Sequence, residues 1–245
     1  MLKKISLIAL VLMGLLCCSS LIACSANSTT KSATPSIYFG TLQGIVYKNS
    51  IAQSGESVIT SIDGSLVTST AVDSQYNLYA MTFAGNVWVY KDSIWQLIGG
   101  RSLGNSAACF NRLAIDISNN IYAIDNNGYL YISNTSHPAW TLYSGGLIDN
   151  SHVSSIYAAS NGNIYAGAGH GAYTTNIGNP NWSLIGGESL AGASDSSIFA
   201  LAVKNSNVYA TMAESNVYVF NSNSQSWSIV GNKIPGLGAW NALAV

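Results

Sequence analysis

A repeat of just over forty residues is the feature of this sequence that most restricts its fold. A tetrapeptide ending in Tyr-Ala occurs four times, and its tyrosines are 43 or 44 residues apart. These tyrosines are Tyr79, Tyr122, Tyr165 and Tyr209. Each repeat then continues to a tryptophan, at positions Trp95, Trp140, Trp182 and Trp227. A period in the low forties, with several short strands per unit, is the signature of a β-propeller blade.

The third unit illustrates the strands that we expect in each repeat. Its four expected strands are Arg112–Asp116, Asn120–Ile124, Tyr129–Ser133 and Trp140–Ser144. Their alternation of β-branched and aromatic residues with polar ones predicts strands and not helices. The segment Asp125–Gly128 between the second and third strands suits a tight hairpin that needs positive φ. We therefore predict an all-β protein.

The number of units predicts how the ring closes. Four complete units run from about Ser69 to Pro235. Ahead of them, Ile37–Gly40, Gly44–Tyr47 and Ser57–Gly64 match the second, third and fourth strands of another unit. Its first strand is missing, and Asn241–Val245 (NALAV) resembles the first strand Phe199–Val203 (FALAV). An uncovered inner edge leaves backbone groups unpaired. We predict a five-bladed β-propeller of four-stranded antiparallel blades, its ring closed by the C-terminal strand completing the first blade.

The N-terminus has the pattern of an export signal. Lys3 and Lys4 precede an apolar run that is too short to be read as a spanning helix. The run leads to Leu21-Ile22-Ala23-Cys24, which resembles the bacterial lipobox. This resemblance implies that residues 1–23 are a signal peptide and that Cys24 carries several acyl chains, which together make a stable anchor. Residues 24–35 are small and polar and read as a flexible tether, so residues 36–245 form the propeller.

The lipobox resemblance also implies a location. Ser25 follows the modified cysteine, and a residue other than Asp there favours the outer membrane in bacteria with two membranes. We expect a lipid-anchored protein of the cell envelope, at the outer membrane, whose anchor makes the membrane a partner. The alternative is ordinary cleavage after Ala26, followed by secretion.

Composition excludes some partners. Only 8% of the residues are charged, against roughly 25% in an average protein. Without Lys3 and Lys4 the chain has seven basic and ten acidic residues, so we expect no basic patch and no nucleic-acid binding. Once Cys24 is lipidated and residues 1–23 are removed, Cys109 is left alone, which predicts a small core residue and no internal disulfide. We expect a monomer.

The repeat resembles the tachylectin-like five-bladed propeller lectins. The elements that carry this resemblance are WQLIGG, NNIYA, NGYLY and the terminal WNALAV, and it covers essentially all of Ser36–Val245. The resemblance implies binding of N-acetylated sugars by backbone amides, polar side chains and an aromatic wall. The loops after the tryptophans differ from one another here. We therefore expect one asymmetric site or a protein-binding face, and not five equal pockets.

Candidate ligand-binding residues lie in the loops that a propeller gathers on one face. They are Trp240, Arg101, Asn105, Asp149, Asn150, His152, His170, Glu188 and Asp195. Asp149, His152 and His170 resemble a metal-ligand set in residue type. Their spacing matches no known motif, so we predict no metal and no cofactor. The recurring tyrosines and tryptophans are expected to be packing between blades, whereas Trp240 lies outside the repeat.

These observations lead to a prediction of function. No pair of carboxylates has a spacing that indicates acid–base chemistry, so we assign no catalytic residue and predict that the chain is not an enzyme. We expect a membrane-anchored envelope lipoprotein that acts as a non-enzymatic binding or scaffold module for a glycan or a partner protein. The alternative is a propeller hydrolase or lyase that acts on polysaccharide through loop carboxylates such as Asp149, Glu188 or Asp195.

Overall fold

The protein is all-β throughout the part that its structure describes. This computed structural model describes residues 21–24, 36–40, 45–50, 56–99, 103, 112–125, 127–135, 137–147, 152–176, 178–187, 197–212 and 216–231. Every regular element in these ranges is a strand, which confirms the prediction of an all-β protein. Within the same ranges there is no helix with the length and hydropathy needed to cross a membrane.

The strands form five antiparallel sheets of four strands each. The first sheet contains β1 (Leu21–Cys24), β2 (Ser36–Gly40), β3 (Ile45–Ser50) and β4 (Glu56–Ser61). The second contains β5 (Val67–Val72), β6 (Leu78–Thr82), β7 (Val87–Lys91) and β8 (Ile94–Leu97). The third contains β9 (Arg112–Ile115), β10 (Asn120–Ile124), β11 (Leu130–Asn134) and β12 (His137–Ser144).

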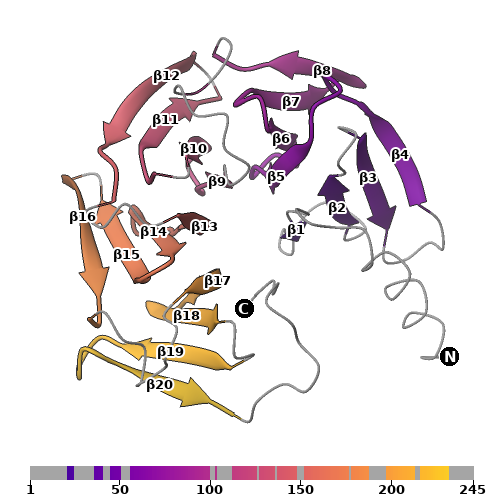
Figure 1. Ribbon diagram of the computed structural model, residues 1–245. Coiled ribbons are helices and arrows are strands. Elements are labelled where there is room, and N and C mark those ends of the chain that lie inside the picture. Colours follow the sequence, from indigo (N-terminus) through magenta and orange to yellow (C-terminus); the bar gives the residue numbers. More distant parts are fainter. Residues whose placement is uncertain are drawn as a thin grey trace, which may run out of the picture.

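The last two sheets follow the same plan. The fourth contains β13 (Val153–Ala158), β14 (Asn163–Ala168), β15 (Gly171–Asn176) and β16 (Asn179–Ile185). The fifth contains β17 (Ile198–Lys204), β18 (Asn207–Met212), β19 (Val217–Asn221) and β20 (Ser226–Val230). Figure 1 shows the sheets around a common centre, with the first strand of each sheet innermost and the fourth outermost. The inner strands β5, β9, β13 and β17 are successive neighbours, which is the arrangement of a β-propeller.

The sequence repeat becomes a repeat of strand register. In the second to fifth sheets the tyrosine of the Tyr-Ala step lies opposite the same position of the inner strand. The pairs are Ala71 with Tyr79, Ala114 with Tyr122, Tyr157 with Tyr165 and Ala202 with Tyr209. In the third sheet the predicted boundaries agree closely with the structure, except that β12 begins at His137, before the expected Trp140. The reason is that the β11–β12 hairpin continues to the pair formed by Asn134 and His137.

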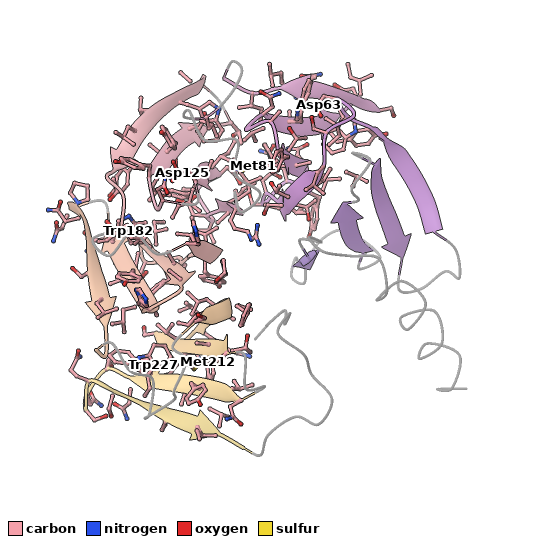
Figure 2. All side chains as sticks on the ribbon, viewed as in Figure 1. Asp63, Met81, Asp125, Trp182, Met212 and Trp227 are labelled. Carbon is pink, nitrogen blue, oxygen red and sulfur yellow. The ribbon has the colours of Figure 1, made fainter. Side chains whose placement is uncertain are left out.

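The tryptophans connect neighbouring sheets. The indole N–H groups of Trp140 and Trp227 donate to the carbonyl oxygens of Ile98 and Ile185, at 2.9 and 3.0 Å. The Trp182 indole donates to the carbonyl oxygens of two glycines. Each acceptor belongs to the preceding sheet, and Figure 2 shows Trp182 where the third and fourth sheets meet. Trp182 and Trp227 are buried, so they are core packing between blades, as the sequence predicts.

Replacing Trp182 by phenylalanine tests this connection. The indole donates to Gly128 at 2.9 Å and to Gly145 at 3.1 Å, so Trp182→Phe removes two hydrogen bonds. We expect the free energy of unfolding to fall by about 1–3 kcal/mol. The matched control is Trp95→Phe, because the buried Trp95 indole nitrogen has no hydrogen-bond partner among the residues that the structure describes. Urea titration should show a smaller loss for the control, and equal losses would contradict a contribution from these bonds.

The turn between β5 and β6 and the turn between β9 and β10 are each built around a buried aspartate. The Asp116 carboxylate accepts hydrogen bonds from the backbone N–H groups of Ser118 and Asn120, the Asn120 amide and the Tyr122 hydroxyl. Asp73 has the same set of partners in the second sheet, where Tyr79 supplies the hydroxyl. Burial, followed by the charge of Asp116, raises the pKa of Tyr122. The tyrosine of the repeat therefore has a hydrogen-bonding role as well as a packing one.

The inner strand of the first sheet differs from the prediction. We expected Asn241–Val245 at this position, but these residues lie outside the described part of the chain. The structure places β1 there instead, with Leu21 opposite Phe39 and Cys24 opposite Ile37. The physical reason is that the edge of β2 needs a strand partner, and the apolar segment just before it in the chain can supply one. The last three residues of the expected signal peptide and Cys24, the first residue of the expected tether, thus occupy the expected place of the C-terminal strand.

Candidate functional site

One end of the propeller collects the loops that carry the predicted site. We call it the upper face and define it by its described residues 62–66, 82–86, 125, 127–129, 145–147, 152, 168–171, 186–187 and 197. The strand pairing places these segments together, because Val67 lies opposite Thr82 and Val153 lies opposite Ala168. The opposite end, the lower face, holds the turns 73–77, 116–120 and 159–163. The described residues of the upper face include no lysine or arginine.

Two of the predicted ligand-binding residues lie in the described part of the upper face. His152 directly precedes β13, and His170 lies in the turn between β14 and β15. Because Val153 pairs with Ala168, both histidines lie at the same end of the fourth sheet, as predicted. Both side chains are exposed. Their role in binding stays a prediction.

The other predicted site residues lie outside the described part of the chain. They are Trp240, Arg101, Asn105, Asp149, Asn150, Glu188 and Asp195. The structure therefore does not test whether Asp149 lies near the two histidines. Among the described residues, no group of three or more His, Cys, Asp or Glu side chains could hold a metal ion.

Asp63 connects the first two sheets on the upper face. Its carboxylate accepts hydrogen bonds from the Ser65 backbone N–H at 2.9 Å, the Thr82 hydroxyl at 3.2 Å and the Asn86 amide at 3.3 Å. Partial burial acts to raise the pKa of Asp63, but these hydrogen bonds outweigh it and lower the pKa below its usual value. Asp63 is therefore an exposed, ionised carboxylate on this face (Figure 2).

Asp125 shapes the hairpin of the third sheet. It is buried, and its Oδ1 accepts hydrogen bonds from the backbone N–H groups of Asn127 and Tyr129, both at 2.9 Å. Burial raises the pKa of Asp125, although these backbone bonds oppose the shift. Gly128 has φ of 82°, which confirms the tight turn with positive φ that the sequence predicts. The engaged carboxylate holds the hairpin in one shape.

This hairpin presents an aromatic ring on the upper face. Tyr129 is 41% exposed, and its ring lies against Gly146, where an added Cβ would be 3.1 Å from Cε2 of the ring. The backbone N–H of Leu147 donates to the Asn127 carbonyl at 2.9 Å, which joins this loop to the hairpin. Tyr129 was not among the predicted site residues, because the sequence assigns it to the strand Tyr129–Ser133. The structure begins β11 one residue later, so Tyr129 belongs to the turn.

Comparison with known proteins identifies the fold. No family model matches the chain, and no curated protein matches it. Virginiamycin B lyase from Staphylococcus aureus superposes with a TM-score of 0.67 at 9% identity, over 87% of this chain and 70% of the lyase chain. A catalytically inactive form of this lyase with quinupristin gives a TM-score of 0.69 at 8% identity, over 89% and 72%. The extracellular domain of a one-component system from B. thetaiotaomicron gives 0.60 at 14% identity, over 86% of this chain and 28% of that one.

Identities this low show the fold alone. The chain has a β-propeller fold, and its structural neighbours include an enzyme and an extracellular domain. This corrects the prediction that the chain is not an enzyme. That prediction rested on the absence of a spaced carboxylate pair and was wrong, because a neighbour with the same fold over most of this chain's length is a lyase. Fold does not determine function, so the site itself must decide it.

Proposed function

We propose that this protein is a lipid-anchored cell-envelope protein that binds a glycan on the upper face of a five-bladed propeller. The single observation that carries the proposal is the exposed Tyr129 ring on the hairpin that the Asp125 carboxylate bonds. The anchor follows from the lipobox-like Leu21–Cys24, and Ser25 favours the outer membrane. A partner protein is the runner-up ligand.

The chemistry of the upper face favours a glycan. A sugar ring has an apolar face that packs on a flat aromatic ring, while its hydroxyl groups need nearby polar atoms. The face offers Tyr129, exposed histidines and several glycine backbone groups. The resemblance of the repeat to tachylectin-like lectins points to the same class of ligand.

The proposal includes the closed ring. Five sheets are present, and in the processed chain we place Asn241–Val245 beside β2 as the inner strand of the first blade. Support comes from the sequence, because Ala242–Val245 repeats the ALAV of β17 at Ala200–Val203. Closing the ring covers the inner edge of the first sheet and sets the shape of the upper face.

A glycan array probed with the processed protein in detergent tests the function. We expect binding to a restricted set of neutral or N-acetylated glycans. Tyr129→Ala should weaken the affinity for the best glycan by about tenfold, or about 1.4 kcal/mol. The control is Tyr76→Ala, since Tyr76 is similarly exposed, at 38%, but lies on the lower face. Calorimetric titration of both variants measures the difference.

Two outcomes would overturn the glycan proposal. The first is an array with no binding, and the second is an equal loss of affinity in the Tyr129→Ala and Tyr76→Ala variants. If the array shows no binding and affinity capture recovers a partner protein, the runner-up ligand is supported instead.

A second candidate is a polysaccharide lyase or hydrolase acting on the same face. The observation that favours it is the fold shared with a lyase, together with the carboxylate of Asp63 on the upper face. Mass spectrometry of the bound glycan after incubation separates the two functions. Cleaved product that disappears in Asp149→Asn, Glu188→Gln or Asp195→Asn variants would establish catalysis, whereas intact glycan would leave binding as the function.

A further inference from the structure

We infer that the lower face of the propeller rests on the lipid surface to which the chain is anchored. The side chains that make this contact are Tyr76, Ile94 and Ile117, with Lys91 beside them, and we call these four the lower-face patch. The inference rests on the proposed lipid anchor at Cys24. It adds an orientation, in which the upper face with the proposed glycan site points away from the membrane.

The chain enters the propeller at its lower face. Second strands of the sheets run from the lower face to the upper face, as β6 does after the turn 73–77, and β2 is the second strand of its sheet. Ser36, the first residue of β2, therefore lies at the lower end, and Cys24 lies there as well because it pairs with Ile37. A dozen extended residues span at most about 40 Å, so the anchor stays near this face.

Three large apolar side chains of the lower face are exposed. Ile117 is 69% exposed, Ile94 is 56% exposed and Tyr76 is 38% exposed. The turns that hold Tyr76 and Ile117 are joined directly, because the backbone N–H and the hydroxyl of Ser74 donate to Oδ1 of Asn119 at 3.1 and 2.9 Å. Ile94 begins β8 in the same sheet as Tyr76. Side chains of this kind gain free energy when an apolar surface covers them.

The backbone of Tyr76 gives an independent sign of a contact outside the molecule. In the turns 73–77, 116–120 and 159–163, the N–H of the fourth residue donates to the carbonyl of the first. That fourth residue is Tyr76, Asn119 or Gly162, with φ of 66°, 62° or 82°. Asparagine and glycine adopt this left-handed conformation readily, whereas a bulky residue is uncommon there. The fold alone therefore disfavours a tyrosine whose ring remains partly exposed.

The charge of the lower face favours a lipid surface as its occupant. Lys91 ends β7 and Lys204 ends β17, and both are exposed at the lower end of their sheets, with Asp92 next to Lys91. On the upper face the described residues include the exposed carboxylate of Asp63 and no lysine. Anionic lipids attract lysines near a membrane surface, and tyrosine is enriched where headgroups meet acyl chains. Exposed isoleucines beside them fit the same boundary.

The repeat itself supplies substitutions that should preserve the turns. Tyr76→Asn introduces the residue that the third sheet has at this position, Asn119, and Ile117→Ser introduces the residue that the second sheet has, Ser74. The double variant removes two side chains of the lower-face patch, and urea titration checks that it stays folded. The matched control is Leu142→Ser, because Leu142 is 58% exposed but lies on β12, the outer strand of the third sheet.

Spin labels in the processed chain test the orientation. One label is attached at Ser118→Cys on the lower face and another at Ala84→Cys on the upper face, each with Cys109→Ser, and both labelled positions are exposed. Intact mass spectrometry first establishes whether acyl chains are present. The protein is then placed in vesicles of phosphatidylethanolamine and phosphatidylglycerol. Electron paramagnetic resonance compares how often each label meets oxygen, which concentrates in the bilayer, and a nickel complex, which stays in water.

We expect the label at Ser118→Cys to meet oxygen more than nickel, and the label at Ala84→Cys to do the reverse. The double variant should shift the Ser118→Cys label toward nickel, whereas Leu142→Ser should leave it unchanged. If the double variant does not fold, Ile117→Ser alone gives the same comparison.

Several results would overturn the inference while the lipid anchor survives. They are a lower-face label that meets nickel as freely as the upper-face label, a lower-face label that meets neither reagent because protein covers it, and a double variant that shifts nothing. A processed chain without acyl groups would overturn the anchor and this inference together. The glycan array remains a separate test of the upper face in every case.

Discussion

Removal of Asn241–Val245 from the processed chain is expected to abolish cooperative folding. The deletion takes away the proposed partner of β2, including Leu243 and Val245, which correspond to Leu201 and Val203 of β17. Burying one such side chain contributes about 1.5–3 kcal/mol, and the lost strand pairing adds to this. The total is comparable to the 5–15 kcal/mol by which whole domains are stable.

Thermal unfolding followed by far-ultraviolet circular dichroism measures this effect. The truncated chain should show no sigmoidal transition and should aggregate through the open edge of the first sheet. The matched control is Asn241→Phe, which converts the segment to the FALAV of Phe199–Val203 and should retain the transition. A truncated chain that melts at the temperature of the full processed chain would contradict the closed ring.

Substitution of Asp116 by alanine is expected to cause a large loss of stability, as is the equivalent substitution of Asp73 on the same face. The buried carboxylate accepts four hydrogen bonds, one of them from the Tyr122 hydroxyl at 3.0 Å. Each hydrogen bond to a charged group contributes about 1.5–3 kcal/mol, and bonds to one carboxylate are not additive. We therefore expect Asp116→Ala to lower the free energy of unfolding by about 3–5 kcal/mol.

The fourth sheet provides the control for this prediction. It has Ala159 at the equivalent position, and there the Asn161 side-chain oxygen accepts the bond from the Asn163 backbone N–H at 3.1 Å. Adding Ser118→Asn to Asp116→Ala reproduces that turn and should restore part of the lost stability. Chemical denaturation of both variants, compared with Asp63→Ala on the upper face, measures the effect. A loss no larger than that of Asp63→Ala would contradict the role of the buried carboxylate.

The sequence predicts the sheets well because their signal is periodic. The Tyr-Ala step and the tryptophans recur in every complete unit, and the structure places each set at one position of the sheets. The first sheet departs from prediction because the apolar Leu21–Cys24 is equally able to pair with an open edge. The alternation of apolar and polar residues did not show whether Leu21–Cys24 or Asn241–Val245 would be the strand paired with β2.

The candidate site is harder to predict because its loops share no period. The segments between sheets differ in sequence, so no repeated position indicates which side chains converge. His152 and His170 could be placed together because each directly adjoins a predicted strand. Tyr129 was missed because a tyrosine next to a strand fits the alternating pattern. Its exposure depends on the Asp125 hairpin and on the bare backbone of Gly146, which are properties of the folded chain.

Hydrogen–deuterium exchange of the processed protein, with and without the best glycan from the array, tests the central claim most directly. The claim predicts slower exchange in residues 127–129, 145–147 and 168–171 of the upper face, and unchanged exchange in the lower-face turns 73–77 and 116–120. Protection confined to the lower-face turns, or no protection at saturating glycan, would contradict a glycan site on the upper face.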